Sequence, residues 1–374
     1  MPEQTVLEVS ETGTILSIIN GPHPEAIFYE GVLAPGFVNA HCHLELSHMK
    51  GVVPEHTGLI PFLKTIPKHR NDFTELQKSK ARHNAYEELL QNGVVAVGDI
   101  SNSTDTLDIR LRDKLHFHTF IEAIGFNDDR ADIAFGYALQ NYNAFAEQQP
   151  GKVQLRQAIA PHAHYSVSRS LFRKINAHSP GSTITIHNQE SKAEDEFFRS
   201  GTGGITELLG SLNIDYSAFI PSGKSSLQTY LDTITTDHSI IFVHNTYTQR
   251  EDVQYAKSKL NKTFWCLCPN ANLYIEGQLP DINMLLEEDA HICIGTDSLA
   301  SNHQLCILSE LYTIKLHYPD FDWELLLCWG TLESACALQM QIQTGHISEG
   351  LAPGINQILL LDEPGFKPLV KRIF

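Results

Sequence analysis

The chain has 374 residues, of which 42% are hydrophobic and 19% are charged, a composition typical of a folded globular protein and unlike that of a disordered or fibrous one. Its 27 Lys and Arg residues against 44 Asp and Glu residues give a formal net charge of −17, which disfavours nucleic acids and anionic membrane surfaces as partners and favours a small molecule. The first residues do not resemble a secretory signal, and no stretch approaches the ~18 apolar residues of a membrane span. The seven cysteines suggest no disulfide framework. We therefore expect a cytoplasmic protein.

Short apolar and β-branched runs alternate with helix-like segments along most of the chain, which predicts parallel βα units. In the helix-like segment ELQKSKARHNAYEELLQNG, apolar residues recur at steps of three and four, and Gly93 supplies the stop signal. The eight expected strands begin near residues 32, 94, 117, 153, 182, 239, 263 and 291. Eight units favour an α/β fold with a closed (β/α)₈ barrel, which we place at residues 36–344. A doubly wound open sheet is the alternative, but no glycine-rich nucleotide loop follows the first expected strand.

The two ends of the chain, residues 1–35 and 345–374, do not fit this alternation. The N-terminal segment VLEVSETGTILSII contains a hairpin signal at Glu11-Thr12-Gly13, and the C-terminal segment INQILLLDEP is an apolar run followed by turn residues. We therefore expect the two ends to pair into a small composite β-sheet module.

Ionisable side chains stand at the carboxyl ends of several expected strands, where the reactive groups of a parallel barrel collect. His41 and His43 close the first strand, and because alternate residues of a strand face the same side, both can point to the barrel axis. His187 closes the fifth strand and Asp297 the eighth. Burying these groups without a partner is costly, so a shared cation explains them best, and three imidazoles with one carboxylate suit Zn²⁺, or Fe²⁺ in a more open site.

Several motifs resemble those of the amidohydrolase superfamily. The segment PGFVNAHCHLE resembles its strand-one signature, in which Pro-Gly precedes the strand and His-x-His binds the metal ion. The segment TIHNQES is similar to the strand-five motif of the aminohydrolase branch, where a glutamate follows the ligand histidine by three residues. The segments VHNTYT, CPNANLYIEGQLP and GTDSLASNHQLCILSEL extend the resemblance over nearly the whole barrel. Within this branch, the chain is most similar to deaminases and chlorohydrolases that act on purine, nucleoside or triazine rings.

A narrower resemblance is to the 6-aminodeoxyfutalosine deaminase family of the alternative menaquinone pathway. It rests on HCHLELSHMKG with LIPFL shortly after it, on APHAHYSVSRSLFRKI and on TIHNQESKAEDEFF. In that family a glutamate stands just after the second histidine, and Glu45 occupies this place. Related enzymes usually have Pro-His-Ser-Pro-Tyr where this chain has Pro161-His162-Ala163-His164-Tyr165. Only His162 is carried over, and the role of His164 stays open.

The resemblance implies a hydrolytic deaminase that releases ammonia from an aminopurine-type nucleoside with the help of one divalent metal ion. Asp297 then has two roles, as a ligand and as the acceptor of the proton of the attacking water. Glu190 protonates the ring nitrogen next to the attacked carbon and later passes a proton to ammonia. His244 hydrogen-bonds the attacking hydroxide and the developing oxygen, and His162 contacts the far edge of the heterocycle. Glu45 either holds a sugar hydroxyl or caps the following helix.

Two alternative functions stay open. The same barrel can release chloride from a triazine, or an amine from guanine or another nucleobase. A metal-free barrel kept as an interaction protein is a different class of function. The βα loops that form the outer wall of such a pocket vary within a fold, so the exact substrate is left undecided, and a homo-oligomer is compatible with the sequence.

Overall fold

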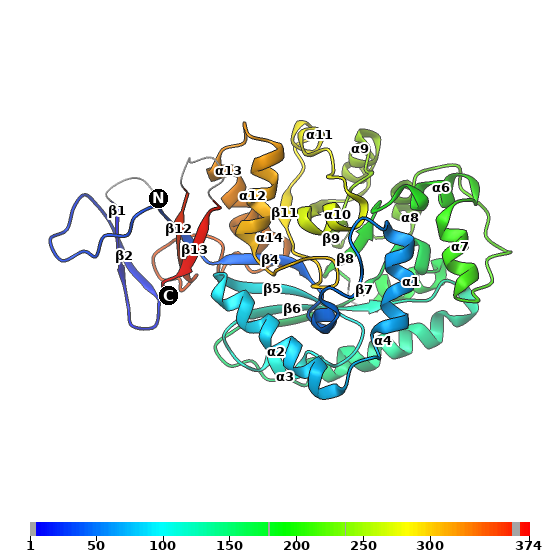
Figure 1. Ribbon diagram of the computed structural model, residues 1–374, viewed down its shortest axis with the longest axis horizontal. Helices are drawn as coiled ribbons and strands as arrows, with labels where there is room; N and C mark the ends of the chain where they lie inside the picture. The colour runs from blue at the N-terminus through cyan, green and yellow to red at the C-terminus, as the bar shows by residue number, and fades with distance from the viewer. Residues whose placement is uncertain (1–4, 179, 236, 361–366) are drawn as a thin grey trace.

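The computed structural model describes residues 5–178, 180–235, 237–360 and 367–374 and confirms the expected α/β barrel (Figure 1). Within each half of the barrel, every pair of neighbouring strands is parallel. The barrel strands are Phe37–Cys42 (β4), Val94–Ser101 (β5), His116–Ala123 (β6), Leu155–Pro161 (β7), Thr183–Asn188 (β8), Ser239–His244 (β9), Lys262–Leu267 (β10) and Ile292–Ile294 (β11).

Two four-stranded ladders, β4–β7 and β8–β11, are joined by backbone hydrogen bonds at two seams. Between β7 and β8, the His187 N–H donates to the carbonyl oxygen of His162 at 2.9 Å. Between β11 and β4, the N–H groups of Thr296 and Asp297 donate to the carbonyl oxygen of His41 at 3.0 and 3.1 Å. Both seams therefore fall at the predicted site residues, which fixes the backbone from which those side chains project.

Helices surround the barrel, and the one expected from its cap and stop residues has both. The expected helix after Thr74 is Glu75–Gln91 (α2), which starts with a capping box between Thr74 and Gln77 and ends before Gly93, whose φ is 74°. No helix in the described residues is both long and apolar enough to cross a membrane. The other helices are Leu59–His69 (α1), Leu107–Arg110 (α3), Ala131–Ala146 (α4), Arg169–His178 (α5), Lys192–Ser200 (α6), Gly204–Ser211 (α7), Ser226–Tyr230 (α8), Arg250–Lys259 (α9), Pro269–Glu276 (α10), Ile282–Glu287 (α11), Ile307–His317 (α12), Trp323–Cys328 (α13) and Ser334–Ala337 (α14).

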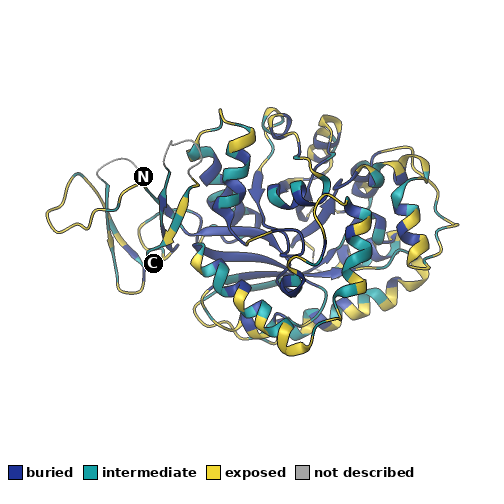
Figure 2. Ribbon diagram, viewed as in Figure 1, coloured by how far each residue is buried: buried dark blue, intermediate teal, exposed yellow. Residues whose placement is uncertain are grey.

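The core lies inside the barrel and between its strands and the inner faces of the helices. Figure 2 shows the barrel strands buried along most of their length, while exposed residues gather on the outer helix faces and in the N-terminal hairpin. Strands covered on both faces read as continuous apolar runs, which is why β9 and β10 contain segments such as IIFV and FWCL. All seven cysteines are free thiols, as expected.

The first expected strand, VLAPGFVNAH, is two strands in the structure. Val32–Pro35 (β3) belongs to a small sheet outside the barrel, and β4 begins after Gly36. A Cβ atom at Gly36 would lie 2.2 Å from a methyl carbon of Val95 and 2.8 Å from the carbonyl oxygen of Pro353, so only glycine fits this junction.

The two ends of the chain form two small antiparallel sheets instead of a single one. Thr5–Val9 (β1) and Ile15–Asn20 (β2) make the expected hairpin, with Gly13 in its turn at a φ of 84°. The second sheet has the order β13-β12-β3, in which Ile355–Leu359 (β12) lies between β3 and Leu369–Arg372 (β13). The ends of the chain thus pair through β3 and β12. The division of the chain near residues 35 and 345 stays a prediction.

Candidate active site

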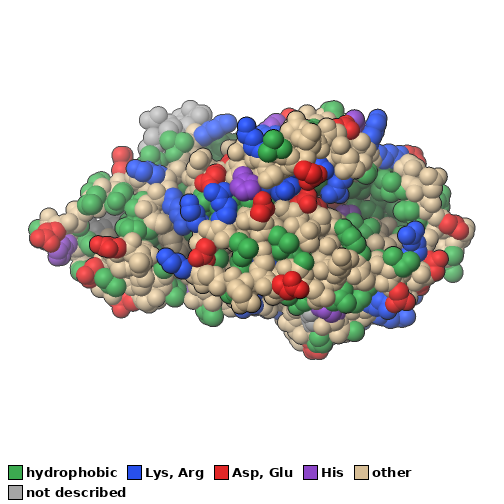
Figure 3. Space-filling model, turned by 90° about the horizontal axis from the view of Figure 1, so that it is seen from below, with side chains coloured by type: hydrophobic (Ala, Val, Ile, Leu, Met, Phe, Trp, Pro, Cys, Tyr) green, Lys and Arg blue, Asp and Glu red, His purple; other side chains and the backbone are tan. Residues whose placement is uncertain are grey.

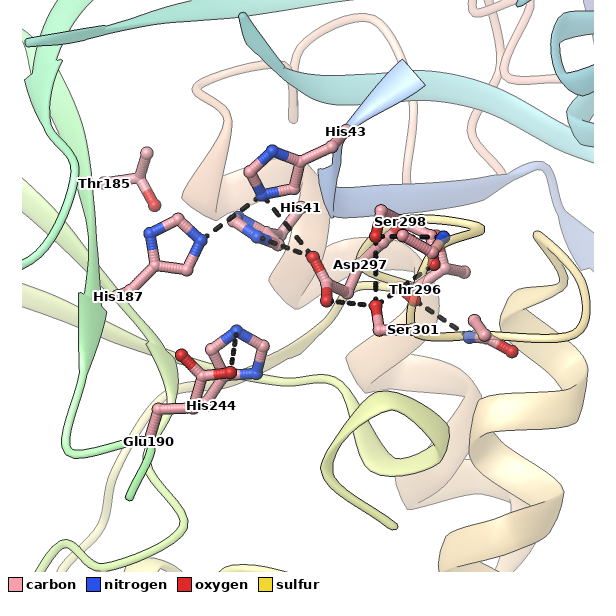
Figure 4. A network of polar contacts seen from close by, with 12 residues as sticks. His41, His43, Thr185, His187, Glu190, His244, Thr296, Asp297, Ser298 and Ser301 are labelled. Atoms are coloured by element: carbon pink, nitrogen blue, oxygen red, sulfur yellow. Dashed lines mark hydrogen bonds and ion pairs between the residues drawn. The ribbon is translucent and has the colours of Figure 1, made fainter. Parts of the chain in front are cut away.

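The four side chains predicted as metal ligands lie together at the carboxyl end of the barrel (Figure 4). The Nε2 atoms of His41 and His43 each lie 3.5 Å from Oδ1 of Asp297. Nε2 of His43 lies 3.3 Å from Nε2 of His187. All four side chains are buried. Three imidazoles and one carboxylate, from β4, β8 and the end of β11, thus converge on one point.

The hydrogen bonding of this cluster fits a bound cation. Three buried ring nitrogens, Nδ1 and Nε2 of His41 and Nδ1 of His43, have no hydrogen-bond partner among the described residues. Nδ1 of His187 lies 2.8 Å from the carbonyl oxygen of His162, which can only accept, so Nδ1 carries the proton and the lone pair of Nε2 points into the cluster. A buried ring nitrogen without a partner is costly, and a divalent metal ion would satisfy Nε2 of His41, which lies 3.5 Å from Oδ1 of Asp297 in the cluster.

The electrostatics of the cluster keep its members in the protonation states that a metal ion needs. Burial lowers the pKa of His43 to about 3, against the opposing pull of Asp297, and lowers the pKa of His187 well below its ordinary value. For Asp297, burial acts to raise the pKa, but the imidazoles of His41 and His43, each 3.5 Å from its Oδ1, outweigh it and hold the pKa below its ordinary range. Neutral imidazoles and an ionised carboxylate follow.

Two of the predicted residues are held by backbone in the left-handed region. The φ of His244 is 73° and that of Asp297 is 56°, a conformation that costs a non-glycine residue about 1–3 kcal/mol. Asn272 supports His244 at two points, since its Oδ1 lies 3.0 Å from Nδ1 and its Nδ2 donates to the carbonyl oxygen at 3.2 Å. The hydroxyl of Ser301 donates to Oδ2 of Asp297. These bonds offset the cost and aim both side chains at the cluster.

Glu190 and His244, the two other residues with a predicted catalytic role, are neighbours. Oε1 of Glu190 lies 3.6 Å from Nε2 of His244, and Glu190 is 6% exposed. Burial raises the pKa of Glu190 to about 7, with His244 acting in the opposite direction. A carboxyl group with this pKa can hold a proton at neutral pH and release it during a reaction. The ring nitrogens of His244, His41 and His187 also lie close enough to one another to share a cation.

A cavity of about 860 Å³ opens above the cluster. We call its polar base, formed by His43, His162, His187, Glu190, His244 and Asp297, the cavity floor. We call its apolar side the outer wall, which consists of Leu59, Phe62, Leu63, Ile66, Ile124, Phe126, Ile133, Leu208, Leu209, Leu212 and Ile214. Sites that take small molecules combine a few polar groups with mostly apolar walls in this way. On the face drawn in Figure 3, acidic and basic side chains are interspersed, which gives no extended basic surface there for a polyanion.

His162 lines the cavity floor, as expected, whereas His164 does not reach the cavity. Nδ1 of His162 lies 2.7 Å from the hydroxyl oxygen of Ser166, and burial lowers the pKa of His162 to about 4. The ring of His164 is stacked on Phe198 with the ring centres 3.7 Å apart, and its Nδ1 lies 3.3 Å from the hydroxyl oxygen of Ser226. His164 thus packs in the core beside the barrel.

Glu45 lines the cavity but bonds to the protein itself. Its carboxylate accepts hydrogen bonds from the N–H of Asn102 at 3.0 Å, from the side-chain amide of Asn102 at 3.1 Å and from the hydroxyl of Ser103 at 3.1 Å. The short helix that contains Glu45, Leu44–Met49 (η1), has no side-chain cap hydrogen bond.

The sequence analysis missed Glu122, which stands near the end of β6 and lines the cavity. Its Oε1 lies 3.4 Å from Nδ1 of His187, and its Oε2 accepts a hydrogen bond from the side-chain amide of Asn102 at 2.7 Å. Burial raises the pKa of Glu122 to about 8. The sequence carries a signal for this residue, because Glu122 is an ionisable residue near the end of the third expected strand.

Comparison with known proteins agrees with the fold. The amidohydrolase family model matches residues 32–359. The aminodeoxyfutalosine deaminase of Nitratiruptor sp. is 26% identical over 291 residues, which are 77% of this chain and 69% of the relative. The crystal structure of Helicobacter pylori aminofutalosine deaminase in complex with methylthio-coformycin superposes with a TM-score of 0.78 at 23% identity, covering 95% of this chain and 88% of that one. An adenosine deaminase from Xanthomonas campestris with bound zinc superposes with a TM-score of 0.71 at 20% identity, covering 96% and 80%.

The family match spans most of the chain and includes every strand of the barrel and every residue of the predicted metal cluster. At these low identities, the superposed structures support the fold alone. The resemblance predicted from the motifs is therefore confirmed: the chain belongs to the amidohydrolase family and is a hydrolase that acts on carbon–nitrogen bonds.

Proposed function

We propose that this chain removes the amino group of an aminopurine-type nucleoside by hydrolysis and releases ammonia, with 6-aminodeoxyfutalosine of menaquinone biosynthesis as the first candidate substrate. The observation that carries the proposal is Glu190, a buried carboxyl group with a pKa of about 7 that lies beside His244 on the floor of a large cavity. A nitrogen heterocycle needs such a proton donor before water can add to it. The aminodeoxyfutalosine deaminase among the relatives supports this choice.

We infer one divalent metal ion, Zn²⁺ in the first place and Fe²⁺ as the alternative, held by His41, His43, His187 and Asp297. When bound, such an ion supplies a Lewis acid that lowers the pKa of water to about 7. The donor set of three imidazole nitrogens and one carboxylate oxygen supports the inference, as does the zinc in the superposed deaminase of Xanthomonas campestris.

The roles of the protein side chains follow from their positions. Asp297, held ionised, accepts a proton from the attacking water, whose oxygen forms a bond to the carbon that carries the amino group. Glu190 gives its proton to the adjacent ring nitrogen, takes up the remaining proton of the added hydroxyl group and passes it to the amino group, so that the carbon–nitrogen bond breaks and ammonia leaves as the carbonyl forms. The proton held by Asp297 then returns to Glu190. His244 hydrogen-bonds the developing oxygen, and His162 contacts the opposite edge of the ring.

The size of the cavity supports a substrate larger than a bare nucleobase. Its volume of about 860 Å³ is near the upper end of the roughly 300–1,000 Å³ that small-molecule sites occupy. The outer wall is apolar, so an apolar substituent on the nucleoside would be buried there. An amino-nucleoside with such a substituent fits the cavity better than guanine or a small triazine does.

A substrate panel tests the proposal. Zinc-loaded protein is assayed for ammonia release from 6-aminodeoxyfutalosine, methylthioadenosine, adenosine and guanine, and for chloride release from a chlorotriazine. We expect the highest kcat/KM on a nucleoside with an apolar substituent. A faster reaction with guanine or the triazine contradicts the proposal. If the zinc-loaded protein turns over none of these compounds, the proposed deamination of a nucleoside is wrong.

A further inference from the structure

Two buried carboxylates in the cavity wall share one amide group. Glu45 of η1 is 1% exposed and Glu122 of β6 is 5% exposed, and both line the cavity. The side-chain nitrogen of Asn102 lies between them, 3.1 Å from Oε1 of Glu45 and 2.7 Å from Oε2 of Glu122. The two carboxylates belong to different elements, and the amide of Asn102 ties them together.

The bonding capacity of Glu45 is largely used within the protein. Oε2 accepts from the N–H of Asn102 and from the hydroxyl of Ser103, and Oε1 accepts from the Asn102 side chain. The guanidinium of Arg70 lies 3.9 Å from Oε1 and balances the charge. A carboxylate with this many donors holds the segment after β5 in place and has little capacity for a substrate.

Glu122 keeps one oxygen available. Its Oε2 is bonded to Asn102, but no described residue donates a hydrogen bond to Oε1. The nearest nitrogen, Nδ1 of His187 at 3.4 Å, already donates its proton to the carbonyl oxygen of His162 at 2.8 Å. A nearly buried carboxyl oxygen that lines a cavity and lacks a donor can accept a hydrogen bond from a ligand whether or not the group is ionised.

A second metal ion is a poorer match for this position than a hydroxyl group. Ligand atoms of Glu122, His162 and His187 do lie close to one another. However, His187 would have to present the lone pair of Nδ1, and this atom carries a proton because it donates to a carbonyl oxygen. The position therefore suits a neutral group that donates hydrogen bonds.

We propose that Glu122 binds the sugar hydroxyls of the substrate, and that Glu45 acts through Asn102 as a positioning residue. This inference rests on the proposed nucleoside deamination. In an aminopurine nucleoside, the sugar is attached to the five-membered ring, away from the carbon that carries the amino group. Glu122 lies beside His162, which we place at that far edge, and thus on the side of the cavity that the sugar would occupy.

The test combines variants of the protein with substrates that lack one hydroxyl group. The kcat/KM values of the parent protein, Glu122→Gln and Glu122→Asp are measured with adenosine, 2′-deoxyadenosine and 3′-deoxyadenosine. We expect the parent to favour adenosine over the deoxynucleoside that lacks the bound hydroxyl by about 10- to 100-fold. Glu122→Gln removes most of this preference by lowering kcat/KM for the substrates that carry the bound hydroxyl and not for the one that lacks it, and Glu122→Asp has an intermediate preference.

Two further variants serve as controls. Glu207→Gln removes the same charge from an exposed position on α7 outside the cavity and should change none of the three values. Glu45→Gln should weaken the preference less than Glu122→Gln does. Circular dichroism and metal content verify that each variant is folded and loaded.

The possible failures are distinguishable. If Glu122→Gln loses activity equally on all three substrates, Glu122 has only a structural role and the inference is wrong. If the parent deaminates nucleosides without any preference for a hydroxyl group, the inference is wrong while the proposed function stands. If the zinc-loaded parent deaminates no nucleoside, the proposed function fails and the inference fails with it.

Discussion

The cavity floor and the outer wall differ in how their residues are held. The metal cluster of the floor projects from strand ends at the two barrel seams, where backbone hydrogen bonds fix His41, His187 and Asp297. Most of the outer wall comes from α1, α4, α7 and the segments beside them. Groups that transfer protons need fixed positions, whereas an apolar wall needs only shape and can change without disturbing the chemistry. The proposed function therefore assigns the reaction to the floor and the choice of substrate to the wall.

The largest expected effect is at the metal cluster. His187→Ala removes one of the four donors, so we expect metal occupancy to fall and kcat to drop by about 10³-fold or more, because Lewis-acid activation is worth several kcal/mol. Elemental analysis and steady-state kinetics measure both quantities. A variant that retains one full equivalent of metal contradicts the ligand assignment.

The second-largest effect is expected at Glu190, and it distinguishes proton transfer from metal binding within the cavity floor. Glu190→Gln preserves the shape of the side chain but cannot carry the proton, so kcat should fall by about 10²–10⁴-fold with metal content near normal. Glu207→Gln is the matched control and should behave like the parent. Full activity in Glu190→Gln would exclude the proton-transfer role.

The pH dependence tests the same residue without a mutation. Burial raises the pKa of Glu190 to about 7, and the residue must be protonated to act as an acid. Activity that depends on this proton is present below this pKa and is lost as the pH rises through it, by about tenfold for each further unit. A profile of kcat/KM between pH 6 and 9 gives the answer, and a profile that is flat across pH 7 would mean that Glu190 does not donate the proton.

The smallest effect is expected at the outer wall. Leu212 lines the cavity and is 46% exposed, so Leu212→Ala should cost little stability. We expect kcat/KM to fall by about fivefold for methylthioadenosine, whose apolar substituent would lose about 1 kcal/mol of contact, and to stay unchanged for adenosine. An equal loss of kcat/KM on both substrates would contradict the idea that the outer wall affects the choice of substrate and not the reaction.

Features that depend on local patterns were predictable from the sequence. The alternation of apolar runs and helix-like segments predicted the barrel, and the hairpin around Gly13 and the end of α2 before Gly93 followed from turn and cap residues. The residues predicted as metal ligands come together because a parallel barrel brings its strand ends to one face. Residue spacing along a single strand was enough to place His41 and His43 on the same side.

Features that depend on contacts between distant elements required the tertiary structure. Gly36 divides the first expected strand because Val95 and Pro353 leave no room for a side chain there.

The tertiary structure also determines which distant residues form hydrogen bonds or stacking contacts with the polar side chains. The sequence left the role of His164 open, and the structure stacks its ring on Phe198 outside the cavity. Glu45 lines the cavity, but Asn102 donates to both oxygens of its carboxylate. The strand sequence does not show which oxygen of Glu122 is free, because the hydrogen bonding of its two oxygens depends on distant residues: Asn102 donates to Oε2, and His187, the neighbour of Oε1, donates elsewhere. The sequence by itself thus determined the barrel and the residues for a metal cluster. Which carboxylate is free for a substrate was decided by tertiary packing, because hydrogen-bond saturation depends on neighbours far away in the chain.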